Sequence, residues 1–225
     1  MLKDRLNEVL LKIRRSVERV GRDPNEIRLV AVGKGHPPES IVEAYELGLR
    51  DFGENRAQEL KEKVEKLKDL DITWHFIGRI QTNKVKLFVP IVDYVHSVWR
   101  EKEIVEIDKR ARSIGKRIKV FIEVNISGEE TKAGVKPENL KNLLNFAERF
   151  ENVEIIGLMT MAPYVEDPEE VRWVFRKLRL IRDDLRESFP NLKELSMGMS
   201  NDFEVAIEEG ATFLRIGTAI FGPRG

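Results

Sequence analysis

Eight short β-type runs alternate with amphipathic helical patterns along this chain, and that alternation sets the tightest limit on its fold. The runs cover residues 29–32, 50–53, 73–77, 94–98, 119–125, 153–160, 195–198 and 213–217. Strands that alternate with helices pair in parallel, because each helix carries the chain back across the sheet. Eight such units in 225 residues fit a closed barrel better than an open sheet. We therefore predict an α/β fold consisting of a single (β/α)8 TIM barrel.

The first twenty residues predict an extra N-terminal helix that packs on the barrel. Its apolar residues recur at helical spacing, and Gly21 and Pro24 end the pattern. These residues are Leu2, Leu6, Val9, Leu10, Ile13, Val17 and Val20. Further along, Pro137 opens a helix, and Asp167 with Glu170 has the spacing of a capping box. No linker or repeat interrupts the chain, and it ends soon after the eighth run, so we expect one domain spanning residues 1–225.

Composition removes several classes of function. Lysine plus arginine equals aspartate plus glutamate, at 39 each, so no net field recruits nucleic acid or an anionic membrane. The absence of cysteine excludes disulfides, thiolate nucleophiles and cysteine-ligated metals, and the three histidines lack metal-site spacing. Charges scattered through the first residues are untypical of a secretion signal or a membrane span. We expect a cytoplasmic protein with no metal, nucleic acid or membrane partner.

Lys34 is the sharpest candidate for chemistry. In parallel α/β folds, reactive groups gather where strands end, and Lys34 follows the apolar run 29–32 between two glycines. Partial desolvation at that position favours the neutral amine, which is the form that attacks a carbonyl. The glycines leave space for a ring beside it. A solvated lysine at a strand end is the simpler alternative when Lys34 is considered by itself.

Two further clusters follow the seventh and eighth runs. Ser200 and Asn201 precede a short helical pattern that Gly210 ends, and Gly217 and Thr218 follow the eighth run. Barrels often bind phosphate between the loops after strands seven and eight, where backbone N–H groups are available. Helix capping explains Ser200 or Asn201 equally well alone, but the coincidence of the two clusters favours an anion site.

Arg215 lies in an otherwise apolar run, where a guanidinium needs an acceptor. Two kinds of acceptor remain open from the sequence. One is an acidic side chain from the set Glu204, Glu208 and Glu209. The other is a pyridine nitrogen.

Several motifs, taken in order, resemble those of the pyridoxal phosphate homeostasis proteins. They are VAVGKxxP, DFGENxxQE, WHFIGxxQxNK, HSV, VNISGEExKxG, GLMTMxP, SMGMSNDFEVAIEEGA and RIGTAIFG, and they run from Leu29 to Gly222. Each motif is modest alone, whereas the order and the long final block are specific. The resemblance implies a barrel like the N-terminal domain of alanine racemase.

The resemblance also implies roles for individual residues around pyridoxal 5'-phosphate (PLP). Lys34 is implied to form a Schiff base with the cofactor, and Arg215 is implied to face the pyridine nitrogen. The remaining cofactor-binding residues implied are Asn55, Met199, Ser200, Gly217 and Thr218. Two departures from the family pattern are visible, namely the glycines Gly33 and Gly35 around the lysine, and Arg56 after DFGEN, where tyrosine is common. Neither departure removes an implied cofactor residue.

An arginine opposite the pyridine nitrogen leaves the ring a weak electron sink, because it stays cationic and does not protonate that nitrogen. We therefore expect a carrier that buffers PLP and passes it transiently to PLP-dependent apoenzymes, acting as a monomer with little or no turnover. A small amino acid racemase is the alternative, with Lys34 and either His75 or Tyr164 as its two bases. A Schiff-base aldolase or sugar-phosphate enzyme on the same barrel is a third.

Overall fold

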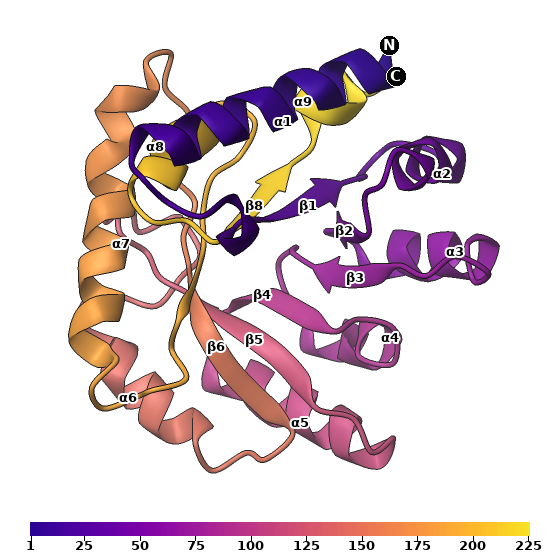
Figure 1. The fold of residues 1–225 in the computed structure, drawn as a ribbon. Coiled ribbons are helices and arrows are strands. Elements are labelled where there is room, and N and C mark those ends of the chain that lie inside the picture. The colour runs from indigo at the N-terminus through magenta and orange to yellow at the C-terminus, as the bar shows by residue number, and fades with distance from the viewer.

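The computed structural model describes residues 1–225, and its eight parallel strands close into a barrel in the order of the sequence (Figure 1). The strands are β1 (Arg28–Val32), β2 (Asp51–Glu54), β3 (Thr73–Phe76), β4 (Tyr94–Val98), β5 (Ile118–Glu123), β6 (Val153–Met159), β7 (Glu194–Ser196) and β8 (Phe213–Ile216). β8 pairs with β1 and closes the ring. All eight predicted strands are confirmed. The seventh ends before its predicted limit because Gly198 has a φ of +103°, which a strand residue does not adopt.

Helices surround the barrel and connect successive strands (Figure 1). They are α1 (Leu2–Arg19), α2 (Pro38–Glu46), α3 (Ala57–Lys66), α4 (Val85–Phe88), α5 (Glu101–Ser113), α6 (Pro137–Ala147), α7 (Arg172–Leu185), α8 (Phe203–Glu208) and α9 (Thr218–Phe221). Three short 3₁₀ turns are η1 (Pro24–Glu26), η2 (Thr82–Lys84) and η3 (Pro168–Val171). Pro137 opens α6 as predicted. Asp167 does not form the predicted capping box, because it accepts from Glu169 N at 3.0 Å and begins η3 instead.

The predicted N-terminal helix is confirmed as α1, which packs against α8 and α9 (Figure 1). Its buried apolar residues are Leu2, Leu6, Val9, Ile13 and Val17. Leu10 and Val20 are exposed, contrary to the prediction. Leu10 lies about 100° around the helix from Val9, and Val20 lies beyond the last helical residue, so neither faces the barrel. Arg5 donates to the carbonyl oxygens of Ile220 and Phe221 and thereby ties α1 to α9.

The inside of the barrel has an apolar part and a polar part. A small cluster made of Val30, Tyr94, Phe121, Met159 and Phe213 fills the apolar part. The larger apolar core lies between the barrel and its helices. Arg215 pairs with Val30 in the parallel ladder, and paired residues of neighbouring strands point to the same side of a sheet. Arg215 therefore points into the barrel, toward the carboxyl ends of the strands.

Candidate functional site

Lys34 lies directly after β1, at the carboxyl ends of the strands. Gly33 N donates to Gly53 O at 3.1 Å, which continues the pairing of β1 with β2 for one residue beyond the strand. Lys34 is half-buried, and its Nζ has no hydrogen bond or ion pair within the protein. The amine is therefore uncommitted, as a nucleophilic lysine requires.

The turn that carries Lys34 is held by a buried lysine that the sequence analysis missed. Lys63 of α3 donates from Nζ to Gly33 O at 2.7 Å, to Glu54 Oε1 at 2.6 Å and to Glu59 Oε1 at 2.8 Å. Gly35 N donates to the same oxygen of Glu59 at 2.8 Å. Both backbone groups beside Lys34 are thus fixed to one ion-pair cluster.

The two glycines that depart from the family pattern fit this cluster. A Cβ on Gly33 would lie 3.0 Å from Glu54 Oε1, so a larger residue would press on the buried carboxylate. Gly35 has a φ of +75°, which favours glycine. The signal for Lys63 was present in the sequence as Glu59 four residues earlier and as Glu54 at the end of the second predicted strand.

Glu54 is the costly member of the cluster. It is fully buried, its Oε1 accepts from Lys63, and its Oε2 has no partner. Burial raises the pKa of Glu54 to about 7, although Lys63 acts in the opposite direction. The cluster therefore combines a strong ion pair with one unsatisfied carboxylate oxygen next to the Lys34 turn.

The loops after β7 and β8 come together, as the sequence predicted. Ala219 N donates to Ser200 Oγ at 3.0 Å, which places Ser200 beside Gly217 and Thr218 at the start of α9. The backbone N–H groups of Ser200 and Asn201 donate to no acceptor in the protein. Unpaired N–H groups beside a hydroxyl form a site suited to an anion.

Hydrogen bonds fix the backbone of these loops, and other side chains on them are exposed. Asn201 Nδ2 donates to Val165 O at 2.7 Å and so links the loop after β7 to the one after β6. Met199 N donates to Asp202 Oδ1 at 2.7 Å, while the Met199 side chain is 40% exposed. Thr218 is exposed as well. The backbone of this loop is fixed, whereas the Met199 and Thr218 side chains face outward.

The acidic partners proposed for Arg215 were wrong. Arg215 is 4% exposed and donates from Nη1 to Ser196 Oγ at 2.5 Å and from Nη2 to Thr160 O at 3.1 Å. Glu208 and Glu209 instead bind arginines on the outside of the barrel, namely Arg19, Arg172, Arg176 and Arg179. β8 points Arg215 inward, while α8 lies outside the barrel, so the two sets do not meet.

No carboxylate binds Arg215 directly, although two act on it through space. Burial lowers the pKa of Arg215 to about 10, and Glu123 and Asp202 act in the opposite direction. Burial likewise raises the pKa of Glu123 to about 7, with Arg215 opposing it. The Nε of Arg215 has no acceptor in the protein. A guanidinium that is buried this deeply with a donor to spare is suited to a ligand acceptor.

Asn55 follows β2 next to the Lys34 turn, and its backbone is packed closely against the next loop. A Cβ on Gly78 would lie 1.9 Å from Asn55 O, which no side chain tolerates. Asn55 is half-buried. The structure thus brings Lys34 and Asn55 to neighbouring strand ends on the same face of the barrel.

Of the two residues considered as a second base, His75 is poorly placed for that role. His75 is fully buried, and both of its ring nitrogens are hydrogen-bonded, to Asp51 at 2.8 Å and to His96 at 2.9 Å. Tyr164 is 81% exposed. A general base must reach the substrate proton, so His75 does not fit the role that we considered for it.

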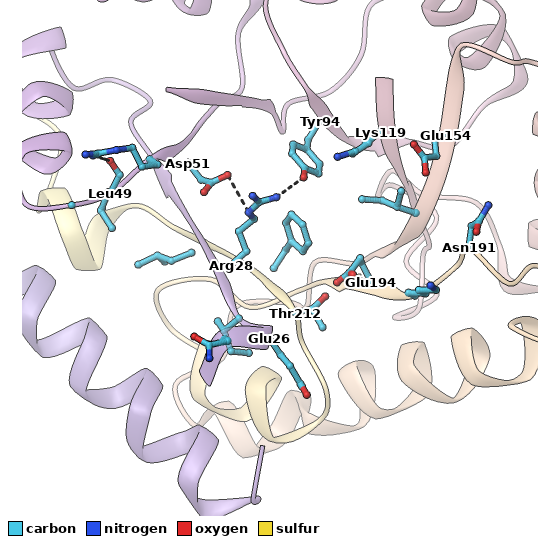
Figure 2. A pocket seen from close by; sticks show the side chains of 18 residues that line it. Glu26, Arg28, Leu49, Asp51, Tyr94, Lys119, Glu154, Asn191, Glu194 and Thr212 are labelled. Atoms are coloured by element: carbon cyan, nitrogen blue, oxygen red, sulfur yellow. Dashed lines mark hydrogen bonds and ion pairs between the residues drawn. The ribbon is translucent and has the colours of Figure 1, made fainter. Parts of the chain in front are cut away.

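A pocket of about 820 Å³ opens at the opposite end of the barrel, around Arg28 and Asp51 (Figure 2). Arg28 Nε lies 3.4 Å from Asp51 Oδ1, and Arg28 also donates to the Tyr94 hydroxyl. Residues at the amino ends of strands line this pocket, so it is separate from Lys34. No helix has the length and apolar character needed to cross a membrane.

Comparison with known proteins gives a consistent set of relatives. The family model described as "Alanine racemase, N-terminal domain" matches residues 6–225. The pyridoxal phosphate homeostasis protein of Aquifex aeolicus is 54% identical over 222 residues, which are 98% of this chain and 97% of that protein. PipY of Synechococcus elongatus, solved with PLP bound, is 36% identical with a TM-score of 0.87, covering 99% of this chain and all of PipY.

A more distant likeness concerns the fold alone. An alanine racemase of Clostridium difficile is 16% identical with a TM-score of 0.73, and the match covers 97% of this chain and 55% of that enzyme. The predicted resemblance to the barrel of alanine racemase is confirmed.

Proposed function

The chain belongs to the family of pyridoxal phosphate homeostasis proteins, built on the barrel of the alanine racemase N-terminal domain, and from this we propose that it binds PLP on Lys34. In this proposal residues 1–225 form one PLP-binding domain. Lys34 Nζ would condense with the aldehyde carbon of the cofactor to form a Schiff base, with the aldehyde oxygen leaving as water. The observation that carries the proposal is an uncommitted amine that lies at the same face as unpaired N–H groups of the loop after β7.

The donors present match the chemistry of PLP. Its phosphate needs several hydrogen-bond donors, and the backbone N–H groups of Ser200 and Asn201 donate to no acceptor within the protein. Gly217 and Thr218 lie beside Ser200 and complete this phosphate site. Asn55 and Met199 border the site in the proposal, at the strand ends next to Lys34 and Ser200.

Arg215 sets what the bound cofactor is able to do. PLP supplies an electron sink for amino acid chemistry, strongest when its pyridine nitrogen is protonated. Arg215 would keep its proton and donate a hydrogen bond to that nitrogen, which would leave the sink weak. His75, one of the two residues considered as a second base, is buried with both ring nitrogens hydrogen-bonded. These features favour a carrier that holds and releases PLP over a racemase.

The carrier proposal extends to partners and location. PipY is a relative of nearly the same length that has been solved both with and without PLP, which is what a carrier that loads and unloads would allow. We propose a cytoplasmic monomer that passes PLP transiently to PLP-dependent apoenzymes.

Loading and transfer are both measurable on the purified protein. Adding PLP is expected to produce a visible absorption band that saturates at one PLP per chain. Mixing the loaded protein with a PLP-dependent apoenzyme is expected to restore that enzyme's activity, with no α-hydrogen exchange of amino acids by the carrier alone. Exchange of α-hydrogen at ordinary enzyme rates, roughly 1 s⁻¹ or faster, would replace the carrier with a racemase.

A further inference from the structure

A chain of hydrogen bonds crosses the inside of the barrel from Arg215 to the pocket of Figure 2. Arg215 Nη1 lies 2.5 Å from Ser196 Oγ, which lies 2.7 Å from His96 Nδ1. His96 Nε2 lies 2.9 Å from His75 Nδ1, and His75 Nε2 lies 2.8 Å from Asp51 Oδ1. Five different strands contribute these side chains. The chain joins the carboxyl-end face to the amino-end face of the barrel.

The arginine at one end and the carboxylate at the other determine which atom donates in each hydrogen bond of this chain. A carboxylate only accepts, so His75 Nε2 carries the proton toward Asp51. Burial lowers the pKa of His75 and lowers that of His96 more strongly, which favours neutral rings with one N–H each. His75 Nδ1 must then accept from His96 Nε2, and His96 Nδ1 must accept from the Ser196 hydroxyl. Ser196 Oγ accepts from Arg215, so every donor points from the arginine to the carboxylate.

Aromatic rings enclose the two histidines. Tyr94 stacks on His75 and Phe121 stacks on His96, each with ring centroids 4.5 Å apart, and Phe213 packs against both histidines. Hydrogen bonds in such a dry interior polarise one another more strongly than in water. Of the chain's two charged ends, Asp51 borders the pocket, with its side chain 15% exposed.

We propose that Ser196, His96, His75 and Asp51 are positioning residues that orient the Arg215 guanidinium for the pyridine end of PLP. The carboxylate fixes the direction of the chain, which makes Ser196 an acceptor for Nη1, while Thr160 O holds Nη2. A charge change at Asp51 then alters PLP binding at the opposite end of the barrel. The proposal rests on the proposed function only for the identity of the ligand that Arg215 meets.

The direction of the chain is testable without PLP. Protein labelled with ¹⁵N-histidine contains three histidines, and a His36→Gln variant identifies the signals of His36, which lies outside the hydrogen-bonded chain. We expect long-range ¹H–¹⁵N spectra at neutral pH to show His75 and His96 as neutral rings protonated at Nε2. A ring protonated at Nδ1, or an imidazolium in either position, would overturn the directed chain even if PLP binds normally.

The coupling to the cofactor is tested by changing the far end of the chain. In Asp51→Asn the dissociation constant for PLP is expected to rise roughly five- to tenfold, at the lower end of coupling between distant sites. The absorption band of the bound cofactor is expected to shift as well, because the guanidinium beside the ring is less firmly held. Asp51→Glu keeps a carboxylate at this position, and the neighbouring pocket has room for one more methylene. This variant is therefore expected to bind PLP as wild type does.

Glu194→Gln is the matched control, because Glu194 lines the same pocket but makes no hydrogen bond to Asp51, His75, His96, Ser196 or Arg215. It is expected to leave the dissociation constant within about twofold of wild type. Wild-type binding and an unchanged band in Asp51→Asn would contradict the proposal, as would equal effects of Asp51→Asn and Glu194→Gln. If Asp51→Asn does not fold, the tautomer spectra of the wild-type protein decide. Failure of wild type to bind PLP would instead contradict the proposed function.

Discussion

Replacing Lys34 with alanine is expected to abolish the visible absorption band that wild type develops with PLP. Nζ of Lys34 is unpaired at the face where the loops after β7 and β8 offer free donors, whereas Nζ of Lys63 beneath the same turn is engaged in three hydrogen bonds, so we expect no substitution by Lys63. PLP is still expected to bind Lys34→Ala weakly through its phosphate. Absorption spectroscopy combined with equilibrium dialysis separates the loss of the covalent link from the loss of binding.

Lys61→Ala is the control for this change. Lys61 is exposed on α3, so its removal is expected to leave both the band and the amount of bound PLP unaltered. A band of full intensity in Lys34→Ala would show that another amine holds the cofactor.

Replacing Lys63 with methionine is expected to lower the free energy of unfolding by about 3–5 kcal/mol at neutral pH and above. The substitution leaves the Glu54 carboxylate buried without its cation and frees the Gly33 carbonyl, and so costs far more than a surface pair. Urea unfolding measures the change. Lys12→Met is the matched control, because the exposed Lys12–Glu8 pair has the same spacing as Lys63–Glu59 and is worth about 0.5 kcal/mol or less.

The Lys63→Met deficit is also expected to depend on pH, with a sign fixed by Glu54. Burial raises the pKa of Glu54 in the folded protein to about 7, against an ordinary value of 4.5, so folding favours the protonated carboxyl. The contribution of Glu54 to the free energy of unfolding is therefore fully present below pH 4.5 and is lost as the pH rises through 7. Without Lys63 the charged Glu54 carboxylate has no cation beside it, so the free energy of unfolding falls further as the pH rises. The deficit is therefore larger at about pH 8 than at about pH 5, and Glu54→Gln in the same background reduces it at the higher pH. A deficit under about 1 kcal/mol at both pH values would contradict a buried ion pair.

Local sequence patterns were sufficient to predict the barrel. Each strand is a short apolar run closed by glycine or polar residues, and each connecting helix has its own apolar stripe, so both signals lie within about ten residues. The positions of Lys34 and of the loops after β7 and β8 followed from the rule that strand ends gather on one face. Errors such as Leu10 and Asp167 concern single side chains, one on the outer face of a helix and the other at the edge of an element.

The contacts between strands could not be predicted in the same way. The partner of Arg215 depends on which residues of β7 and β8 share the inside of the barrel, and Ser196 lies 100 residues from the histidine it meets. Lys63 has the pattern of an ordinary charged helix residue, and only the depth of Glu54 beneath the Lys34 turn makes it a buried partner. Strand register and burial determine the partners of both Arg215 and Lys63, and the local spacing of residues in the sequence predicts neither property.

Reduction of the PLP-loaded protein with borohydride, followed by peptide mapping, tests the central claim most directly. Reduction makes the covalent link permanent, so the modified lysine is identified by mass. The account predicts a single pyridoxyl adduct, on Lys34. An adduct on another lysine with Lys34 unmodified, or no adduct in a protein that has taken up PLP, would contradict it.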